Sequence, residues 1–334
     1  TRTLTLNSGG GTFDTNGFNS TLSGVLSGSG GFTKSGTGTL TLTGANTYSG
    51  GTTINGGTLT GNTTSLQGAI VNNAALTFDQ AATGTFAGAI SGTGSVTKQS
   101  SGTLTLTGTN TYSGGTTVSA GTLTGSTTSL PGSIINHAAL VFDQAVNGTT
   151  TGAISGTGSL TKQGAGTLTL GAASSYSGTT TVSAGTLQLG GANALPSSTA
   201  VTIASGATLA VNGVTQTIGS LAGAGTLSLG GGTLLAGADN SNTTFSGSIA
   251  GAGVFDKIGT GTLTFDSSFT FGGELKLTGG TVALAGINLT VDTLRISGNT
   301  VLDFGSSLAS VLTTTNLIIE NGAEWFTKQG VQST

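Results

Sequence analysis

Threonine and leucine alternate in many short stretches of this chain, as in "TLTLTG" at Thr39–Gly44. A period of two places leucine on one face of a strand and threonine on the other, and β-branched threonine suits the pleated surface of a sheet. Gly-Gly, Asn-Gly and Ser-Gly steps between these stretches supply the positive φ angles that turns need. No stretch has helical periodicity. The pattern predicts strands at Thr39–Thr43, Thr52–Ile54, Thr58–Thr60, Ala75–Phe78 and Phe86–Ile90.

The chain also repeats itself with a period of 64 residues. Its three tyrosines, Tyr48, Tyr112 and Tyr176, are evenly spaced at that period. The same spacing separates three lysines, each within a Thr-Lys-Ser or Thr-Lys-Gln frame: Lys34, Lys98 and Lys162. A worn copy follows, in which Lys257 precedes "IGTGTLTF". Short strands, glycine corners and a fixed long period favour a β-solenoid, in which each coil gains its core by stacking on its neighbours.

We therefore expect an all-β chain folded as one parallel β-solenoid with essentially no α-helix. About three coils of roughly 21 residues per repeat would give roughly 16 coils, or about 75 Å at ~4.8 Å per coil. Residues 1–284 form the repetitive part, with copies at about 34–97 and 98–161, a diverged copy from 162 and the worn copy at about 257–284. Residues 285–334, which include the only tryptophan, Trp325, are predicted to be less repetitive coils or a cap of the same solenoid.

The composition excludes several classes of protein. Only 6% of the 334 residues are charged and the net charge is −3, so the chain lacks the basic patch that nucleic-acid binding requires. A membrane-surface role lacks its basic face for the same reason, and no apolar run is long enough to span a bilayer. The chain has no cysteine for disulfides or thiolate metal sites. We expect no cofactor and no metal.

The stretch "GTLTLTGANTYSGGTTINGGTLTG" at 38–61 resembles the autotransporter-associated β-strand repeat of bacterial autotransporter passenger domains. Stretches 102–125 and 166–189 resemble it well, and 261–282 does so loosely. The resemblance implies a right-handed parallel β-helix exported to the surface of a Gram-negative cell, where family members serve in adhesion, autoaggregation and biofilm. The sequence has no methionine and no carboxy-terminal translocator barrel, so we expect a processed or trimmed chain, or another route to the surface.

Candidate catalytic residues are few. His137 is the only histidine, so a Ser-His-Asp triad would have to use it, but Asn73 stands at the same place one repeat earlier. Asp79 and Asp143 are themselves repeat positions, which favours a role at turns or coil edges. Four other acids lie apart in sequence: Asp266, Glu274, Asp292 and Asp303. Coil stacking could pair acids as in β-helix carbohydrate-active enzymes, yet Arg2 and Arg295 are the only arginines. We predict no catalytic, cofactor-binding or metal-binding residues and no enzymatic activity.

The repeated lysines and tyrosines are interpreted structurally. The lysines are expected to form a sparse ladder at one solvated corner, about three coils apart, with contact to a glycan or anion as the alternative. The tyrosines are expected to pack in the core or at a corner, with a sugar-binding stripe as the alternative. Glycine runs such as Gly50-Gly51 lack the aspartates of calcium-binding repeats and the helix of a phosphate loop, so they are predicted corners.

The predicted function is structural: a secreted or outer-surface protein of a Gram-negative bacterium, acting in adhesion, autoaggregation or biofilm. The alternatives are a passive stalk of a longer autotransporter whose active domain is absent and a β-helix carbohydrate-active enzyme. Predicted partners are other copies of the chain and surface glycans or proteins of the host or of bacteria, without nucleic acid or membrane insertion. The end "TKQGVQST" placed before the start "TRTLTL" resembles the internal "TKQGAGTLTL", which predicts head-to-tail association into an open filament.

Overall fold

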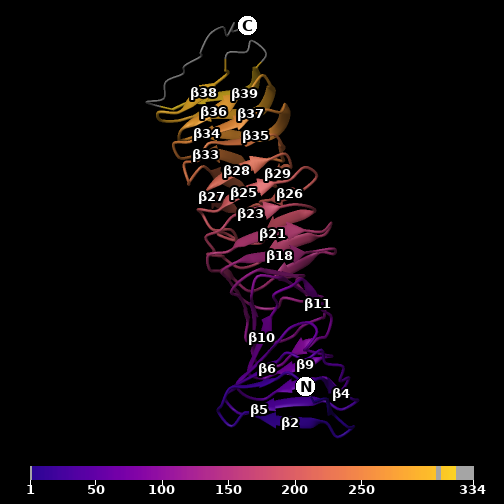
Figure 1. The fold of residues 1–334 in the computed structure, drawn as a ribbon. Helices are drawn as coiled ribbons and strands as arrows, with labels where there is room; N and C mark the ends of the chain where they lie inside the picture. The colour runs from indigo at the N-terminus through magenta and orange to yellow at the C-terminus, as the bar shows by residue number, and fades with distance from the viewer. Residues whose placement is uncertain (1, 306–309, 321–334) are drawn as a thin grey trace. The chain divides into compact units, whose positions relative to one another are not determined.

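The computed structural model describes residues 2–305 and 310–320, which contain 39 strands and no helix. None of these described residues offers a helix long and apolar enough to cross a bilayer. The chain divides into two compact units, one comprising Thr1–Asp143 and Thr150–Ser159 and the other Gln144–Thr149 and Leu160–Thr334. Each unit is a stack of parallel strands (Figure 1). The fold class, an all-β parallel solenoid of about 16 coils, is confirmed.

The strands are short, because turns interrupt the chain after every few residues. Unit 1 contains β1 (Leu4–Thr5), β2 (Gly11–Asp14), β3 (Ser20–Leu22), β4 (Leu26–Ser27), β5 (Phe32–Ser35), β6 (Thr39–Leu42), β7 (Thr52–Ile54), β8 (Thr58–Gly61), β9 (Ile70–Asn72), β10 (Ala75–Asp79), β11 (Gly84–Phe86), β12 (Ile90–Ser91), β13 (Ser95–Gln99), β14 (Thr103–Leu106), β15 (Thr116–Val118), β16 (Thr122–Gly125), β17 (Ile134–Asn136), β18 (Ala139–Asp143) and β20 (Ile154–Ser155). The chain passes between the units after β18, within β19 (Gly148–Thr150) and after Ser159, the first residue of β21.

Unit 2 contains the remaining strands, of which three are nine residues long. They are β21 (Ser159–Gln163), β22 (Thr167–Leu170), β23 (Thr180–Val182), β24 (Thr186–Leu189), β25 (Ala200–Ile203), β26 (Thr208–Ala210), β27 (Thr215–Ile218), β28 (Ser220–Gly223), β29 (Thr226–Ser228), β30 (Thr233–Ala236), β31 (Thr243–Phe245), β32 (Ser248–Ala250), β33 (Val254–Lys257), β34 (Thr262–Phe265), β35 (Phe269–Leu277), β36 (Thr281–Leu284), β37 (Asn288–Ile296), β38 (Val301–Asp303) and β39 (Val311–Ile319).

Three parallel sheets form the faces of unit 1. The first sheet has the order β12-β9-β7-β5-β2, the second β20-β17-β15-β13-β10-β8-β6-β3, and the third includes β11-β14-β16-β18. In unit 2 the three sheets include β22-β24-β26-β29-β32, β21-β23-β25-β28-β31-β34-β36-β38 and β27-β30-β33-β35-β37-β39. Neighbours in each order are strands of successive coils, so every coil hydrogen-bonds to the coil before it.

The core consists of inward-facing aliphatic side chains stacked from coil to coil. On the second sheet, Leu40 pairs with Leu59, which pairs with Leu76, and Leu76 pairs with Val96. All four are fully buried, and each such burial stabilises the fold by about 1.5–3 kcal/mol. The alternating sequence therefore sets which face of each strand is inside, and stacking completes the core.

The length of a coil varies more than the sequence suggested. Paired residues of successive coils lie 17 residues apart at Thr58 and Ala75, and 23 apart at Asn288 and Val311. Turns of different length at the corners account for this range, because the strands themselves stay in register. The average nevertheless stays close to the expected length of roughly 21 residues, since about 16 coils make up the chain.

The 64-residue repeat advances by three coils and one further face. On the first sheet Lys34 pairs with Ile54 and Ile54 with Asn72, and β9 pairs with β12. The strand directly after β12 is β13, which carries the equivalent Lys98 on the second sheet. The same displacement takes β7 to β15 and β9 to β17. Equivalent residues of the first two copies therefore occupy neighbouring faces, and the expected lysine ladder at one corner is wrong.

Buried amides take the place of a strand at one face of a coil in each of the first two copies, next to β4 for Asn46 and next to β12 for Asn110. The Oδ1 atom of Asn46 accepts a hydrogen bond from the backbone N–H of Leu26 at 2.8 Å, and its Nδ2 atom donates to the carbonyl of Ser65 at 2.7 Å. Asn110 does the same one repeat later, accepting from Ile90 at 2.8 Å and donating to Ser129 at 2.7 Å. Each amide thus connects three successive coils in place of a peptide group.

Most predicted strands agree with β6, β7, β8 and β10 to within one residue at each end. The predicted strand Phe86–Ile90 is wrong, because a turn at residues 87–89 separates β11 from β12. The predicted glycine corners are confirmed at Gly51, where φ is +77°. The division at residue 285 remains a prediction, and the proposed cap residue Trp325 lies outside the described residues.

Candidate functional site

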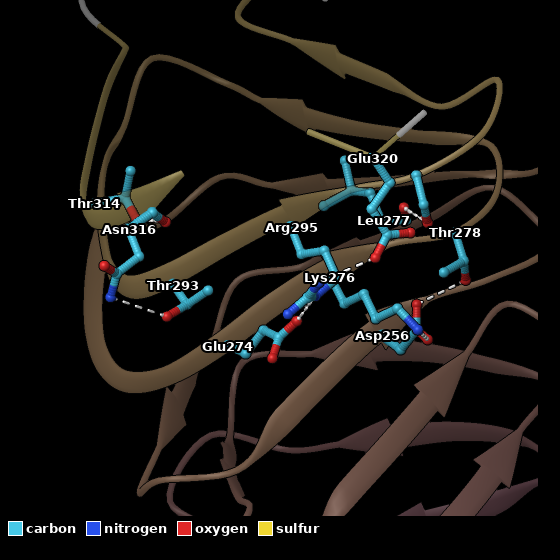
Figure 2. A network of polar contacts seen from close by, with 11 residues as sticks. Asp256, Glu274, Lys276, Leu277, Thr278, Thr293, Arg295, Thr314, Asn316 and Glu320 are labelled. Carbon is cyan, nitrogen blue, oxygen red and sulfur yellow. Dashed lines mark hydrogen bonds and ion pairs between the residues drawn. The ribbon is translucent and has the colours of Figure 1, made fainter. Parts of the chain in front are cut away.

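A network of charged side chains crosses successive coils on one face of unit 2 (Figure 2). Asp256 on β33 pairs in register with Lys276 on β35, which pairs with Arg295 on β37. Glu274 lies two residues before Lys276 on β35, and Glu320 follows β39. Residues that are about 20 apart in sequence thus become neighbours, because about 20 residues make one coil.

The network consists of ion pairs and one hydroxyl contact. The Nζ atom of Lys276 lies 3.5 Å from Oδ2 of Asp256, while the hydroxyl of Thr278 donates to Oδ1 of Asp256 at 2.7 Å. Arg295 donates from Nε to Glu274 at 2.5 Å and from Nη1 to Glu320 at 3.0 Å. These pairs join neighbouring coils from the outside of the solenoid.

The electrostatics of the network follow from burial and pairing. Burial raises the pKa of Asp256 above its ordinary value, while the Thr278 hydroxyl and the nearby Lys276 ammonium oppose the rise. The hydrogen bond to Glu274, followed by the one to Glu320, raises the pKa of Arg295. Arg295 is therefore a cation at neutral pH, and Lys276 and Arg295 each have a carboxylate partner.

A groove of about 370 Å³ lies along this network. Its lining residues are Thr233, Val254, Asp256, Glu274, Lys276, Arg295 and Glu320. Three carboxylates and two bases leave one net negative charge, which disfavours an anionic ligand. The carboxylates and bases of the network form ion pairs with one another. The arrangement is therefore better suited to connecting coils than to acid–base chemistry.

The structure separates most of the acids singled out from the sequence. It brings Glu274 and Arg295 together, but Asp266 and Asp292 are exposed elsewhere, and neither belongs to the network. Among the described residues no group of histidine, aspartate and glutamate could hold a metal ion. Sequence reasoning missed Asp256, Lys276 and Glu320. Each lies about one coil from a charged partner, Asp256 from Lys276 and Glu320 from Arg295, and that spacing was the signal that could have found them.

His137 does not lie in a catalytic arrangement. It is exposed just after β17, and its Nδ1 atom lies 3.4 Å from the hydroxyl of Thr157. Asn73, its equivalent one repeat earlier, is also exposed. Both observations agree with a polar turn position rather than a general base.

The repeated tyrosines are buried, as predicted. Tyr48, Tyr112 and Tyr176 are at most 2% exposed. In each case the phenol oxygen hydrogen-bonds a threonine hydroxyl four residues later, at 2.6–2.7 Å. Burial raises the pKa of Tyr112 to about 12, and raises the pKa values of Tyr48 and Tyr176 as well. A sugar-binding aromatic stripe is therefore excluded for these residues.

The repeated lysines are buried too, which corrects the expected solvated corner. Lys34, Lys98 and Lys162 are 0% exposed. Each lies on an inward position of its strand, since the residue two before it, such as Phe32 before Lys34, also faces the core. The alternative of glycan or anion contact by these side chains fails for the same reason.

These coils define a class of protein, the parallel β-solenoids built from sequence repeats. Within that class, the passenger-associated-transport-repeat matches residues 32–60, 96–124, 160–189 and 255–284. A curated relative, the "Adhesin BmaC autotransporter" of Brucella suis biovar 1 (strain 1330), is 37% identical over 201 residues, which are 58% of this chain and 6% of the relative's length. No solved structure matches. The resemblance to an autotransporter passenger with repeats is confirmed.

Proposed function

We propose that this chain is a non-enzymatic structural segment of a protein on the outer surface of a Gram-negative bacterium, where it acts in adhesion, autoaggregation or biofilm. The observation that carries the proposal is the presence of four passenger repeats in a parallel β-solenoid. The similarity to a protein named as an adhesin supports it. The proposed partners are other copies of the chain and glycans or proteins on bacterial or host surfaces.

The polar exterior also supports a surface role. Six threonines lie in one column on the second sheet of unit 1, and all but the buried Thr60 are at least partly exposed: Thr21, Thr41, Thr60, Thr77, Thr97 and Thr117. The threonine hydroxyls repeated from coil to coil offer hydrogen-bond donors and acceptors that carry no net charge. Such a surface approaches a negatively charged cell envelope without long-range repulsion.

Display on a bacterial surface tests adhesion and aggregation directly. The chain is fused to a translocator domain and exported in a non-aggregating Gram-negative host, and an unrelated passenger of similar length serves as the control. We expect faster settling of the culture and greater retention on epithelial cells than with the control. Equal settling and equal retention, with export verified by surface antibody labelling, would contradict the proposal.

The charged network is the feature that would favour an enzyme. Asp256, Glu274 and Glu320 gather on one face, as paired carboxylates do in β-helix carbohydrate-active enzymes. Each of them is engaged by a base or a hydroxyl, which supports a structural role. Incubation of the purified chain with a panel of neutral and acidic polysaccharides should release no reducing ends. Release that disappears in Glu274→Gln would establish the enzyme instead.

We also propose that copies of the chain associate head to tail through their terminal coils. Among the described residues, the large apolar side chains most exposed at the two ends include Leu4 and Phe18 on one side and Val311, Leu317 and Ile319 on the other, at 47–72%. A neighbouring coil would cover them, and the contact would be heterologous and open-ended. The carboxy-terminal stretch whose sequence suggested this association lies outside the described residues.

Electron microscopy of the purified chain tests head-to-tail association. End-to-end filaments that lengthen with protein concentration are expected. Dispersed single particles at high concentration would refute the association and leave the adhesion assay unaffected.

A passive stalk is the second candidate, because the matched stretch covers 6% of the adhesin relative's length. In that case the displayed chain is exported but neither settles cells nor retains them.

A further inference from the structure

The ammonium groups of the repeated lysines occupy the same backbone surroundings in each copy. The Nζ atom of Lys98 donates to the carbonyls of Gln99 at 2.9 Å, Ser100 at 2.6 Å and Ala120 at 3.0 Å. Lys34 makes the corresponding contacts with Ser35 at 2.7 Å, Gly36 at 2.8 Å and Gly56 at 2.9 Å. The acceptors are thus the carbonyls one, two and 22 residues after the lysine.

The third copy reproduces this geometry in unit 2. Lys162 donates to Gln163 at 2.9 Å, Gly164 at 2.8 Å and Ala184 at 3.0 Å. We call the three carbonyl oxygens at these positions the lysine cage. Two come from the turn that follows the lysine, and the third comes from the next coil.

We propose that each lysine cage is a binding site for a small monovalent cation of the ammonium class, and that the repeat's lysine is its tethered ligand. An ammonium has three N–H donors besides its bond to carbon, and the cage supplies three acceptors at hydrogen-bonding distance. Removal of the side chain would leave these carbonyl dipoles aimed at one point without a partner. A free ammonium ion can then occupy the same position.

The charges around the cage suit a cation. Burial lowers the pKa values of Lys34 and Lys98, but a carboxylate opposes the change in both cases, Asp14 near Lys34 and Asp79 near Lys98. The hydroxyl of Ser100, whose carbonyl belongs to the cage, donates to Asp79. In both copies the nearby aspartate, Asp14 or Asp79, supplies the negative charge that a buried cation needs.

The cage forms only when the next coil is in place. Ala120, its third acceptor, is 22 residues beyond Lys98, and the following Gly121 has φ of +68°. A Cβ atom on Gly121 would lie 2.8 Å from the Nζ atom of Lys98. The cation therefore connects two coils, and the glycine makes room for it.

The worn copy provides a looser cage. The Nζ atom of Lys257 lies 2.6 Å from the carbonyl of Ile258 but 3.5 Å from Gly259 and 3.3 Å from Gly279. Two of its three contacts are therefore weaker. We expect truncation of Lys257 to lower stability less than truncation of Lys98.

Chemical rescue of Lys98→Ala tests the proposal. Thermal unfolding of the full chain is compared in ammonium chloride and in tetramethylammonium chloride at about 0.5 M, since a ligand that binds the folded state raises the melting temperature. We expect the variant to melt below the wild type and ammonium to restore about half of the loss. Tetramethylammonium, which has no N–H donor, should restore none. The matched control is Lys98→Met, in which an apolar side chain fills the space, and ammonium should give it no specific gain.

Equal melting of Lys98→Ala in the two salts would overturn the proposal, as would equal rescue of Lys98→Met. Should Lys98→Ala fail to fold, Lys257→Ala at the looser cage is subjected to the same comparison. A second readout is the NMR signal of ¹⁵N-labelled ammonium. A slowly exchanging bound resonance should appear with the alanine variant and be absent with the wild type. Loss of this signal on addition of water-soluble primary amines would support the ammonium class.

Discussion

Replacement of the buried Asn110 by leucine should weaken the connection among three coils of unit 1. The side chain satisfies the backbone N–H of Ile90 and the carbonyl of Ser129. Leucine has a similar size but offers neither a donor nor an acceptor. Two buried backbone groups are left without partners at about 1–3 kcal/mol each. We expect a loss of about 4 kcal/mol in the free energy of unfolding.

Denaturant unfolding measures this loss, and hydrogen exchange locates it. The amide of Ile90 should lose its protection, because its acceptor is the Asn110 side chain. Thr109→Leu is the matched control, since Thr109 is exposed next to Asn110, and surface substitutions usually stay within about 0.5 kcal/mol. A loss below about 0.5 kcal/mol for Asn110→Leu, with the Ile90 amide still protected, would refute the reasoning.

Three further predictions concern buried groups. In ultraviolet titration of the folded chain, Tyr112 should stay un-ionised until the pH is near 12, while the tyrosines of the denatured chain titrate near pH 10. Since the folded pKa values are raised, the tyrosines' contribution to stability is complete below pH 10 and is lost as the pH rises above it. Titration of the folded tyrosines near pH 10 would contradict their burial. Asp256→Asn should raise the melting temperature or leave it unchanged at pH 7, because burial disfavours the charged carboxylate. The difference in melting temperature between variant and wild type should shrink as the pH falls through the raised pKa of Asp256. A difference that grows in acid would contradict this expectation. Gly121→Ala should lower the free energy of unfolding by about 2 kcal/mol or more, because φ is +68° and the added Cβ would lie 2.4 Å from the carbonyl oxygen of Gly102. Gly191→Ala, with open space around the residue, is the control and should be nearly neutral. Equal effects of the two substitutions would show that the turn at Gly121 is not tightly packed.

The fold was predictable because both the alternation of apolar and polar residues and the 64-residue repeat can be read from the sequence. β6, β7, β8 and β10 were predicted to within one residue at each end, whereas β9 was not predicted. The number of faces that a repeat traverses was not predictable, because it depends on turn lengths at corners where glycine, serine and asparagine are interchangeable. Those turns set the 17- to 23-residue separations between paired residues.

The lysine cages were missed for a different reason. Lysine is almost always exposed, and that expectation outweighed the strand pattern. The pattern itself was informative: in "SVTKQ" Val96 and Lys98 share a face, and Val96 faces the core. The carbonyl partner in the next coil, Ala120, could not be inferred without the register. The charged network required the register too, since Asp256, Lys276 and Arg295 belong to three successive coils.

Successive repeats of this solenoid are displaced by three coils and one face. Dipolar electron paramagnetic resonance on unit 1 tests this displacement with two pairs of spin labels, on cysteines introduced into this cysteine-free chain. Thr33 and Ser91 lie in one column of the first sheet, through Thr53 and Val71, so their backbones should be about 14 Å apart at ~4.8 Å per coil. Thr33 and Thr97 are repeat equivalents on different sheets, and their separation should be longer. A shorter distance between Thr33 and Thr97 than between Thr33 and Ser91 would contradict the displacement. Such a result would mean that the repeat is a whole number of coils and that Thr33 and Thr97 lie on the same face.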